Sequence, residues 1–156
     1  MPRITPMLWF DTEAEEAAEF YCSIFPNSKI TAVSHYTDAG PRPAGTVMTV
    51  SFVLDGQEYT ALNGGPEFKF TEAISLVINC ADQAEVDYYW EKLTDGGQEV
   101  ECGWLKDRYG LAWQVVPAGF EAILSDGDRG RADRWMRAMF GMKKLDVAAL
   151  QAAADG

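Results

Sequence analysis

The pattern of apolar and polar positions along the chain occurs twice, once in each half. In each half a short apolar run, over 7–10 and again over 73–80, precedes a segment whose apolar residues recur at helical spacing. The two helical sets align with an offset of 69 positions, from Ala17 to Val86: Ala17, Phe20, Tyr21 and Ile24 in the first half, and Val86, Tyr89, Trp90 and Leu93 in the second. The chain is therefore predicted to repeat one supersecondary unit.

Each predicted helix begins with a sequence that is typical of a capping box. Thr12 is followed three residues later by Glu15, and Asp82 is followed by Glu85. In such a box, the two side chains accept hydrogen bonds from backbone N–H groups that the first turn leaves without helical partners. We therefore expect both helices to be capped by their own side chains, the first of them over 12–24.

Strand patterns complete both units and define an α+β fold. In the first half we predict strands over 2–10, 29–36, 46–54 and 57–62, the last two joined by an Asp55-Gly56 turn. In the second half we predict strands over 73–80, 98–102, 104–107 and 111–116. The predicted organisation is one domain of two tandem βαβββ units, with a linker and a helical extension: units 1–64 and 73–117, linker 65–72 and extension 118–156.

The extension is expected to contain an amphipathic helix over 129–141 and a short alanine-rich helix capped by Asp146. One face of the first helix is apolar, with Ala132, Trp135, Met136, Met139 and Phe140. This face could pack on the sheet or on a second subunit, or form a Met-rich binding groove; packing is the commoner use. The segment is also locally basic, and we expect a two-fold homodimer in which residues 129–154 pack on the partner.

The chain has 156 residues and a net charge of -11, which narrows the classes of partner. An acidic chain repels phosphate backbones, so nucleic acid is not expected and a neutral or cationic small molecule is favoured. No apolar run is long enough to span a membrane, and the first residues lack the order of a signal peptide, so a cytoplasmic location is expected. The three cysteines, Cys22, Cys80 and Cys102, are interpreted as reduced thiols.

Several segments resemble the vicinal oxygen chelate superfamily, the fold of glyoxalase I, extradiol dioxygenases and bleomycin-resistance proteins. The strings LWFDTEAEEAAEFYCSIFPNSKI, LNGGPEFKFTEAISLVINC and CGWLKDRYGLAWQVVP are similar to its PhnB-like branch, which carries the label 3-demethylubiquinone-9 3-methyltransferase. The resemblance implies that the two units form a cupped mixed β-sheet. It also implies that any ligand binds inside this cup.

Metal-dependent members of the superfamily take ligands from the first and fourth strands of each unit. The matching positions here are Pro6 and Ser75 on the first strands, and Gln114 with Thr60, or else Leu62 or Asn63, on the fourth strands. None of these residues is a good ligand for a divalent metal, and the single histidine, His35, lies in a second strand. The resemblance therefore implies a protein without a metal cofactor. His35 itself is more typical of a strand-end histidine than of a general base.

The label of the branch suggests methyl transfer. Nucleotide-derived cofactors commonly bind at a glycine-rich turn between a strand and a helix, but the junctions WFDTEAE and NCADQAE contain no glycine. No cofactor is therefore expected.

The remaining hypothesis is a metal-free, PhnB-like protein that binds a small molecule in its cup. Aromatic side chains and uncharged amides would line such a site, because an amide can bond a carbonyl or hydroxyl without burying a charge. The candidate lining residues are Phe10, Thr60, Asn63, Ser75, Trp104 and Gln114. The alternative is an enzyme, either a 3-demethylubiquinone 3-methyltransferase-like protein or a metal-assisted lyase or dioxygenase. The sequence assigns no catalytic residue.

Overall fold

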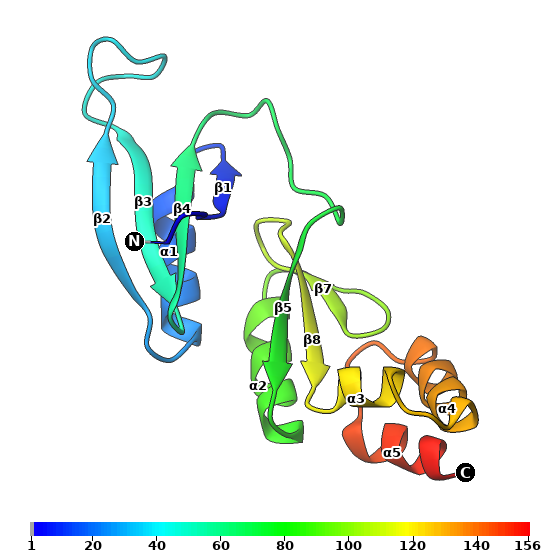
Figure 1. Ribbon diagram of the computed structural model, residues 1–156. Helices are drawn as coiled ribbons and strands as arrows, with labels where there is room; N and C mark the ends of the chain where they lie inside the picture. Colours follow the sequence, from blue (N-terminus) through cyan, green and yellow to red (C-terminus); the bar gives the residue numbers. More distant parts are fainter. Residues whose placement is uncertain (1) are drawn as a thin grey trace. The chain divides into compact units, whose positions relative to one another are not determined.

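The computed structural model describes residues 2–156 and contains two compact units, one that ends at Phe70 and a second over Thr71–Gly156. Each unit holds a four-stranded mixed sheet, and three helices follow the second sheet (Figure 1). The predicted α+β class with a repeated βαβββ unit is confirmed. Neither sheet closes on itself, because the strand orders are β1-β4-β3-β2 and β5-β8-β7-β6.

The first unit packs one helix on one face of its sheet. Its elements are β1 (Met7–Phe10), α1 (Ala14–Ile24), β2 (Lys29–His35), β3 (Val47–Leu54) and β4 (Gln57–Asn63). Strand β1 runs parallel to β4, and the other two pairings are antiparallel. Positive φ angles at Asp55 and Gly56 make the tight β3–β4 turn that was predicted. The core of this unit contains Val50, Phe52 and Ala61 from the sheet and Ala17, Ala18 and Tyr21 from α1.

The prediction that Thr12 and Glu15 cap α1 is wrong. The helix begins at Ala14, and its N-cap residue Glu13 makes no side-chain capping bond. Instead, the Ala14 N–H donates to Oδ1 of Asn63, at 2.8 Å. Parallel pairing places Asn63 opposite Phe10, so the end of β4 lies beside the start of α1 and supplies the cap.

The second unit repeats the arrangement with β5 (Ser75–Cys80), α2 (Gln83–Thr94), β6 (Gln98–Glu99), β7 (Trp104–Lys106) and β8 (Ala112–Pro117). Here the predicted capping box is confirmed. Oδ1 of Asp82 accepts from the Glu85 N–H at 3.0 Å, and Oε1 of Glu85 accepts from the Ala81 N–H at 2.7 Å.

Strand β6 is shorter than predicted. Beyond it, Cys102 has a positive φ of 62°, and the N–H groups of Cys102 and Gly103 donate to the carbonyls of Met142 and Lys143, both at 2.8 Å.

Three helices, α3 (Phe120–Leu124), α4 (Arg129–Phe140) and α5 (Val147–Asp155), make up the extension. They share a small core of their own: Ile123, Trp135, Met139, Leu145, Leu150 and Ala154. Packing of the apolar face of α4 on the sheet or on a second subunit was expected. In the structure this face packs against α3 and α5 of the same chain. In the part of the chain that the structure describes, no helix combines the length and the apolar content needed to cross a bilayer.

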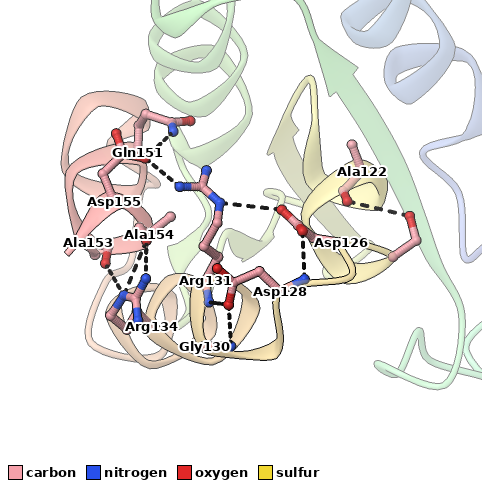
Figure 2. A network of polar contacts seen from close by, with 11 residues as sticks. Ala122, Asp126, Asp128, Gly130, Arg131, Arg134, Gln151, Ala153, Ala154 and Asp155 are labelled. Atoms are coloured by element: carbon pink, nitrogen blue, oxygen red, sulfur yellow. Dashed lines mark hydrogen bonds and ion pairs between the residues drawn. The ribbon is translucent and has the colours of Figure 1, made fainter.

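Two arginines of α4, Arg131 and Arg134, bond residues of the α3–α4 loop and of α5, as Figure 2 shows. The Arg131 guanidinium donates to Asp155 at 2.6 Å and to Asp126 at 3.3 Å. Arg134 donates to the Ala154 carbonyl at 2.7 Å, at the C-terminal end of α5, where a cation is favoured by the exposed carbonyls. Much of the basic patch seen in the sequence thus bonds groups of the same chain.

Candidate functional site

The second sheet has one covered face and one open face. Because side chains alternate along a strand, Ile78, Leu105 and Trp113 lie on the face covered by α2 and are buried. The register places Val77 and Trp104 on either side of Gln114, so these three residues lie on the opposite face. Trp104 and Gln114 are partly buried, and Val77 is exposed.

Gln114 is at the centre of this open face. Its side-chain Nε2 donates to the hydroxyl of Ser75 at 3.0 Å. Among residues 2–156, Ser75 is the only side chain that bonds the Gln114 amide, so a second amide hydrogen and the carbonyl oxygen remain for another partner. Three of the six predicted site residues, Ser75, Trp104 and Gln114, thus share one face.

Two hollows adjoin Gln114 and share Phe120 in their walls. The first has a volume of about 450 Å³ and is lined by Glu72, Val100, Glu101, Cys102, Trp104, Gln114, Phe120, Met139 and Phe140. The second, of about 570 Å³, extends from Gln114 along the other side of the sheet face and includes Val77, Asn79, Val116 and Leu124. We call the first hollow the Trp104 groove.

The charged side chains that line the Trp104 groove are both carboxylates. Glu72 is paired with Lys106, and this hydrogen bond lowers the pKa of Glu72. Glu101 is exposed. Burial, with a smaller contribution from Glu101, raises the pKa of the Cys102 thiol, so this cysteine is a weak nucleophile near neutral pH.

The other three predicted site residues belong to the first unit, where Phe10 and Asn63 are paired in register on one face and Thr60 lies on the other. Thr60 is partly buried and lies between Met7 and Ser51 on the face away from α1. Phe10 is only 3% exposed and packs edge-on against Phe70, with 5.3 Å between ring centroids.

The polar groups of Asn63 take part in a hydrogen-bond network inside the first unit. Besides capping α1, its Nδ2 donates to the Val47 carbonyl at 3.1 Å, and its backbone carbonyl accepts from the Tyr36 hydroxyl at 2.6 Å. Asn63 also borders a hollow of about 470 Å³ beside Arg42 and Thr46. In the described structure its side chain therefore connects β4 with α1 and β3.

Sequence reasoning missed a buried carboxylate that organises the β7–β8 turn. Asp107 is 3% exposed and accepts hydrogen bonds from the Tyr109 and Leu111 N–H groups, at 2.9 and 3.0 Å, and from the Trp113 indole at 2.8 Å. The signal in the sequence is an aspartate two residues before an aromatic residue in the KDRYG turn. These contacts give Asp107 a structural role.

A divalent metal does not fit the side chains at the positions that the family pattern implies. Pro6 offers no side-chain donor, and Ser75 and Gln114 bond each other through neutral groups. Across residues 2–156, no three His, Cys, Asp or Glu side chains come together as a metal-binding group. His35 is exposed on β2, at an edge of the first sheet and opposite Val47.

The repeated βαβββ units and open sheets are the architecture of the vicinal oxygen chelate superfamily. The family model described as 3-demethylubiquinone-9 3-methyltransferase matches residues 2–116, and the chain belongs to this PhnB-like family. The PhnB protein from Bacillus cereus is 36% identical; the match covers 75% of this chain and 100% of that chain, with a TM-score of 0.69.

Other solved structures share the fold at lower identity. Protein PA1353 from Pseudomonas aeruginosa is 22% identical, with 75% of this chain and 98% of that chain covered and a TM-score of 0.62. The fosfomycin resistance protein FosX from Listeria monocytogenes, solved with Mn(II) and sulfate, is 14% identical, with 74% and 89% covered and a TM-score of 0.52. No curated protein matches the chain.

Proposed function

We propose that this protein binds a small, flat and largely apolar molecule in the Trp104 groove, with the Gln114 amide bonding a carbonyl or hydroxyl of that molecule. The observation that carries the proposal is the position of Gln114, a partly buried neutral amide at the edge of an aromatic-lined hollow. A volume of about 450 Å³ suits a small-molecule site. The function is binding or sequestration, in the cytoplasm, where the three free cysteines would stay reduced.

A metal-assisted reaction is not part of the proposal. The FosX structure contains Mn(II), but the positions that the family resemblance implies for metal ligands in this chain carry Pro6, Thr60, Ser75 and Gln114, with Leu62 or Asn63 as alternatives to Thr60. A divalent metal needs carboxylate, imidazole or thiolate ligands, and these residues offer none.

Methyl transfer, which the family description names, has no visible cofactor site among residues 2–156. A nucleotide-derived cofactor would use N–H groups at a helix N-terminus, beside a glycine-rich turn. At α1 the Ala14 N–H is bonded by Asn63, and at α2 the Glu85 N–H is bonded by Asp82. Both strand-to-helix junctions also lack glycine. We therefore propose a binding function rather than a transferase.

The test is a titration with two matched probes followed by ¹⁵N–¹H NMR. 1-Indanone has a flat bicyclic body with a carbonyl, and indane has the same body without it. We expect 1-indanone to shift the Trp104 indole and Gln114 side-chain signals and to bind more tightly than indane. Absence of shifts at Trp104 and Gln114 with both probes would refute the proposal.

A further inference from the structure

The residues that line the Trp104 groove come from two parts of the chain. One part is matched by the family model, and the other lies beyond its end. The family model ends at residue 116, and the whole Bacillus cereus protein is covered by 75% of this chain. Trp104 and Gln114 lie within the matched part. Phe120, Met139 and Phe140, which complete the wall, lie in the extension beyond it.

The extension is held against the second unit by specific bonds. Besides the backbone bonds of Cys102 and Gly103, the side chain of Gln83 in α2 donates to the Leu145 carbonyl at 3.1 Å and accepts from the Val147 N–H at 2.7 Å. Lys144 pairs with Asp87 at 2.9 Å. In Figure 1 the extension accordingly continues from the end of β8 as α3, α4 and α5, all in the second unit. These bonds fix the position of its aromatic residues relative to the sheet.

Phe140 is placed at the groove although it is not part of the core of the extension. It is the last residue of α4 and is 60% exposed, whereas Trp135 and Met139 on the same helix are 5% exposed. Phe120 packs edge-on against Trp135, with 5.2 Å between ring centroids, which fixes its ring. A large exposed aromatic residue at the mouth of a hollow is a surface that a flat ligand can cover.

The charges around the groove favour a cation. Its charged lining residues, Glu72 and Glu101, are both acidic, and Lys106 already pairs with Glu72, so Glu101 provides the negative charge that a ligand can meet. The faces of Trp104, Phe120 and Phe140 attract cations as well, because aromatic rings carry negative charge on their faces. The net charge of -11 adds to this preference.

We propose that the Trp104 groove is selective for flat aromatic cations, with Glu101 supplying the negative charge and Phe140 of the extension supplying a ring face. This inference rests on the proposed binding function and adds the charge class of the ligand. Glu101, which gives the preference for a cation, lies in the part that the family model matches, and Phe140, which adds the ring face, lies in the extension beyond it.

The experiment compares N-methylquinolinium, a cation, with quinoline, which has nearly the same shape and is uncharged at pH 8. Dissociation constants come from the NMR shifts of Trp104 and Gln114. We expect the cation to bind more tightly, and Glu101→Gln to weaken the cation about threefold without changing quinoline, as for an exposed charge pair. Phe140→Ala should weaken both probes about fivefold, by removing a ring face and apolar contact.

Matched controls lie on the same unit. Glu91→Gln removes an exposed charge from α2, away from the groove, and Leu124→Ala removes an exposed apolar side chain that lines only the second hollow; neither should change binding of either probe. Two results would overturn this inference but leave the proposed function standing, provided that 1-indanone still binds. One is equal affinity for N-methylquinolinium and quinoline, and the other is an unchanged affinity for the cation in Glu101→Gln. If 1-indanone also failed to shift Trp104 and Gln114, the proposed function itself would fall.

Discussion

The side-chain amide of Gln114 donates a hydrogen bond to the hydroxyl of Ser75, at 3.0 Å, between strands that lie side by side but are distant in sequence. The bond uses one of the two amide hydrogens, which leaves the second hydrogen for a ligand carbonyl and the Gln114 carbonyl oxygen for a ligand hydroxyl. Gln114 therefore has both a structural partner and a place at the groove, and these two roles can be separated by mutation.

We predict that Gln114→Ala weakens binding of 1-indanone about fivefold, the equivalent of roughly 1 kcal/mol for a neutral hydrogen bond, and leaves indane binding unchanged. Ser75→Ala, which removes only the structural partner, should leave 1-indanone binding within about twofold. The dissociation constants of 1-indanone and indane can be measured for each variant by NMR titration. Equal affinities of wild type and Gln114→Ala, together with a lower melting temperature of the variant, would mean that Gln114 serves the sheet and not a ligand.

Asn63→Ala should destabilise the first unit by about 2 kcal/mol, because it leaves the Ala14 N–H and the Val47 carbonyl without their side-chain partner. Urea unfolding followed by circular dichroism would measure the change. Asn79→Ala is the matched control, since Asn79 occupies the same kind of position near the end of β5 but is exposed; its effect should stay within about 0.5 kcal/mol. A neutral Asn63→Ala would contradict the capping role.

The extension should loosen from the second unit in acid. Asp87 of α2 pairs with Lys144 of the extension, and hydrogen bonds with Lys144 and Gln83 lower the pKa of Asp87. A lowered carboxyl pKa in the folded state contributes stability above the ordinary aspartate pKa of 3.8, and this contribution is lost as the pH falls below it. The NMR signal of the Trp135 indole should report the loosening. Asp87→Asn should make this signal less dependent on pH, and an unchanged dependence would argue against the docking role.

The purified protein, made without a histidine tag, is expected to contain no stoichiometric divalent metal at neutral pH. The reason is chemical, because the expected ligand positions hold Pro6, Ser75, Gln114 and either Thr60 or its neighbours Leu62 and Asn63, and none of these supplies a carboxylate, imidazole or thiolate. Elemental analysis before and after treatment with a chelator would test this. About one equivalent of zinc, nickel, iron or manganese per chain, removed by the chelator, would refute it.

We also propose that the protein is a two-fold homodimer in which the outer face of α4 contacts the partner. Both sheets have edge strands, and α4 exposes Arg129 and Arg137 on an acidic chain, Arg137 being paired with Asp133 at 2.7 Å. Sedimentation at micromolar concentration should give twice the chain mass of 17.2 kDa, and the double substitution Arg129→Glu and Arg137→Glu should favour the monomer. A wild-type monomer would contradict the proposal.

The sequence by itself determined the features whose partners lie a few residues apart. The repeated unit follows from periodicity, the β3–β4 turn from Asp55-Gly56, and the α2 cap from Asp82 and Glu85, which bond backbone groups within four residues of themselves. Local spacing is enough for such bonds, because a single turn of chain brings donor and acceptor together. The family resemblance likewise depended on local strings of residues.

Only the tertiary structure decided which distant residues meet. Asn63 replaces the local cap of α1 from 49 positions away, and Gln114 reaches Ser75 across 39 positions, because strand pairing in parallel register places them together. The extension likewise reaches the β6–β7 turn through the Cys102 and Gly103 amides, which brings Phe140 to a groove that periodicity could not reveal. A hydrophobic pattern shows which side of an element is buried, but the register and packing of the elements decide what that side faces.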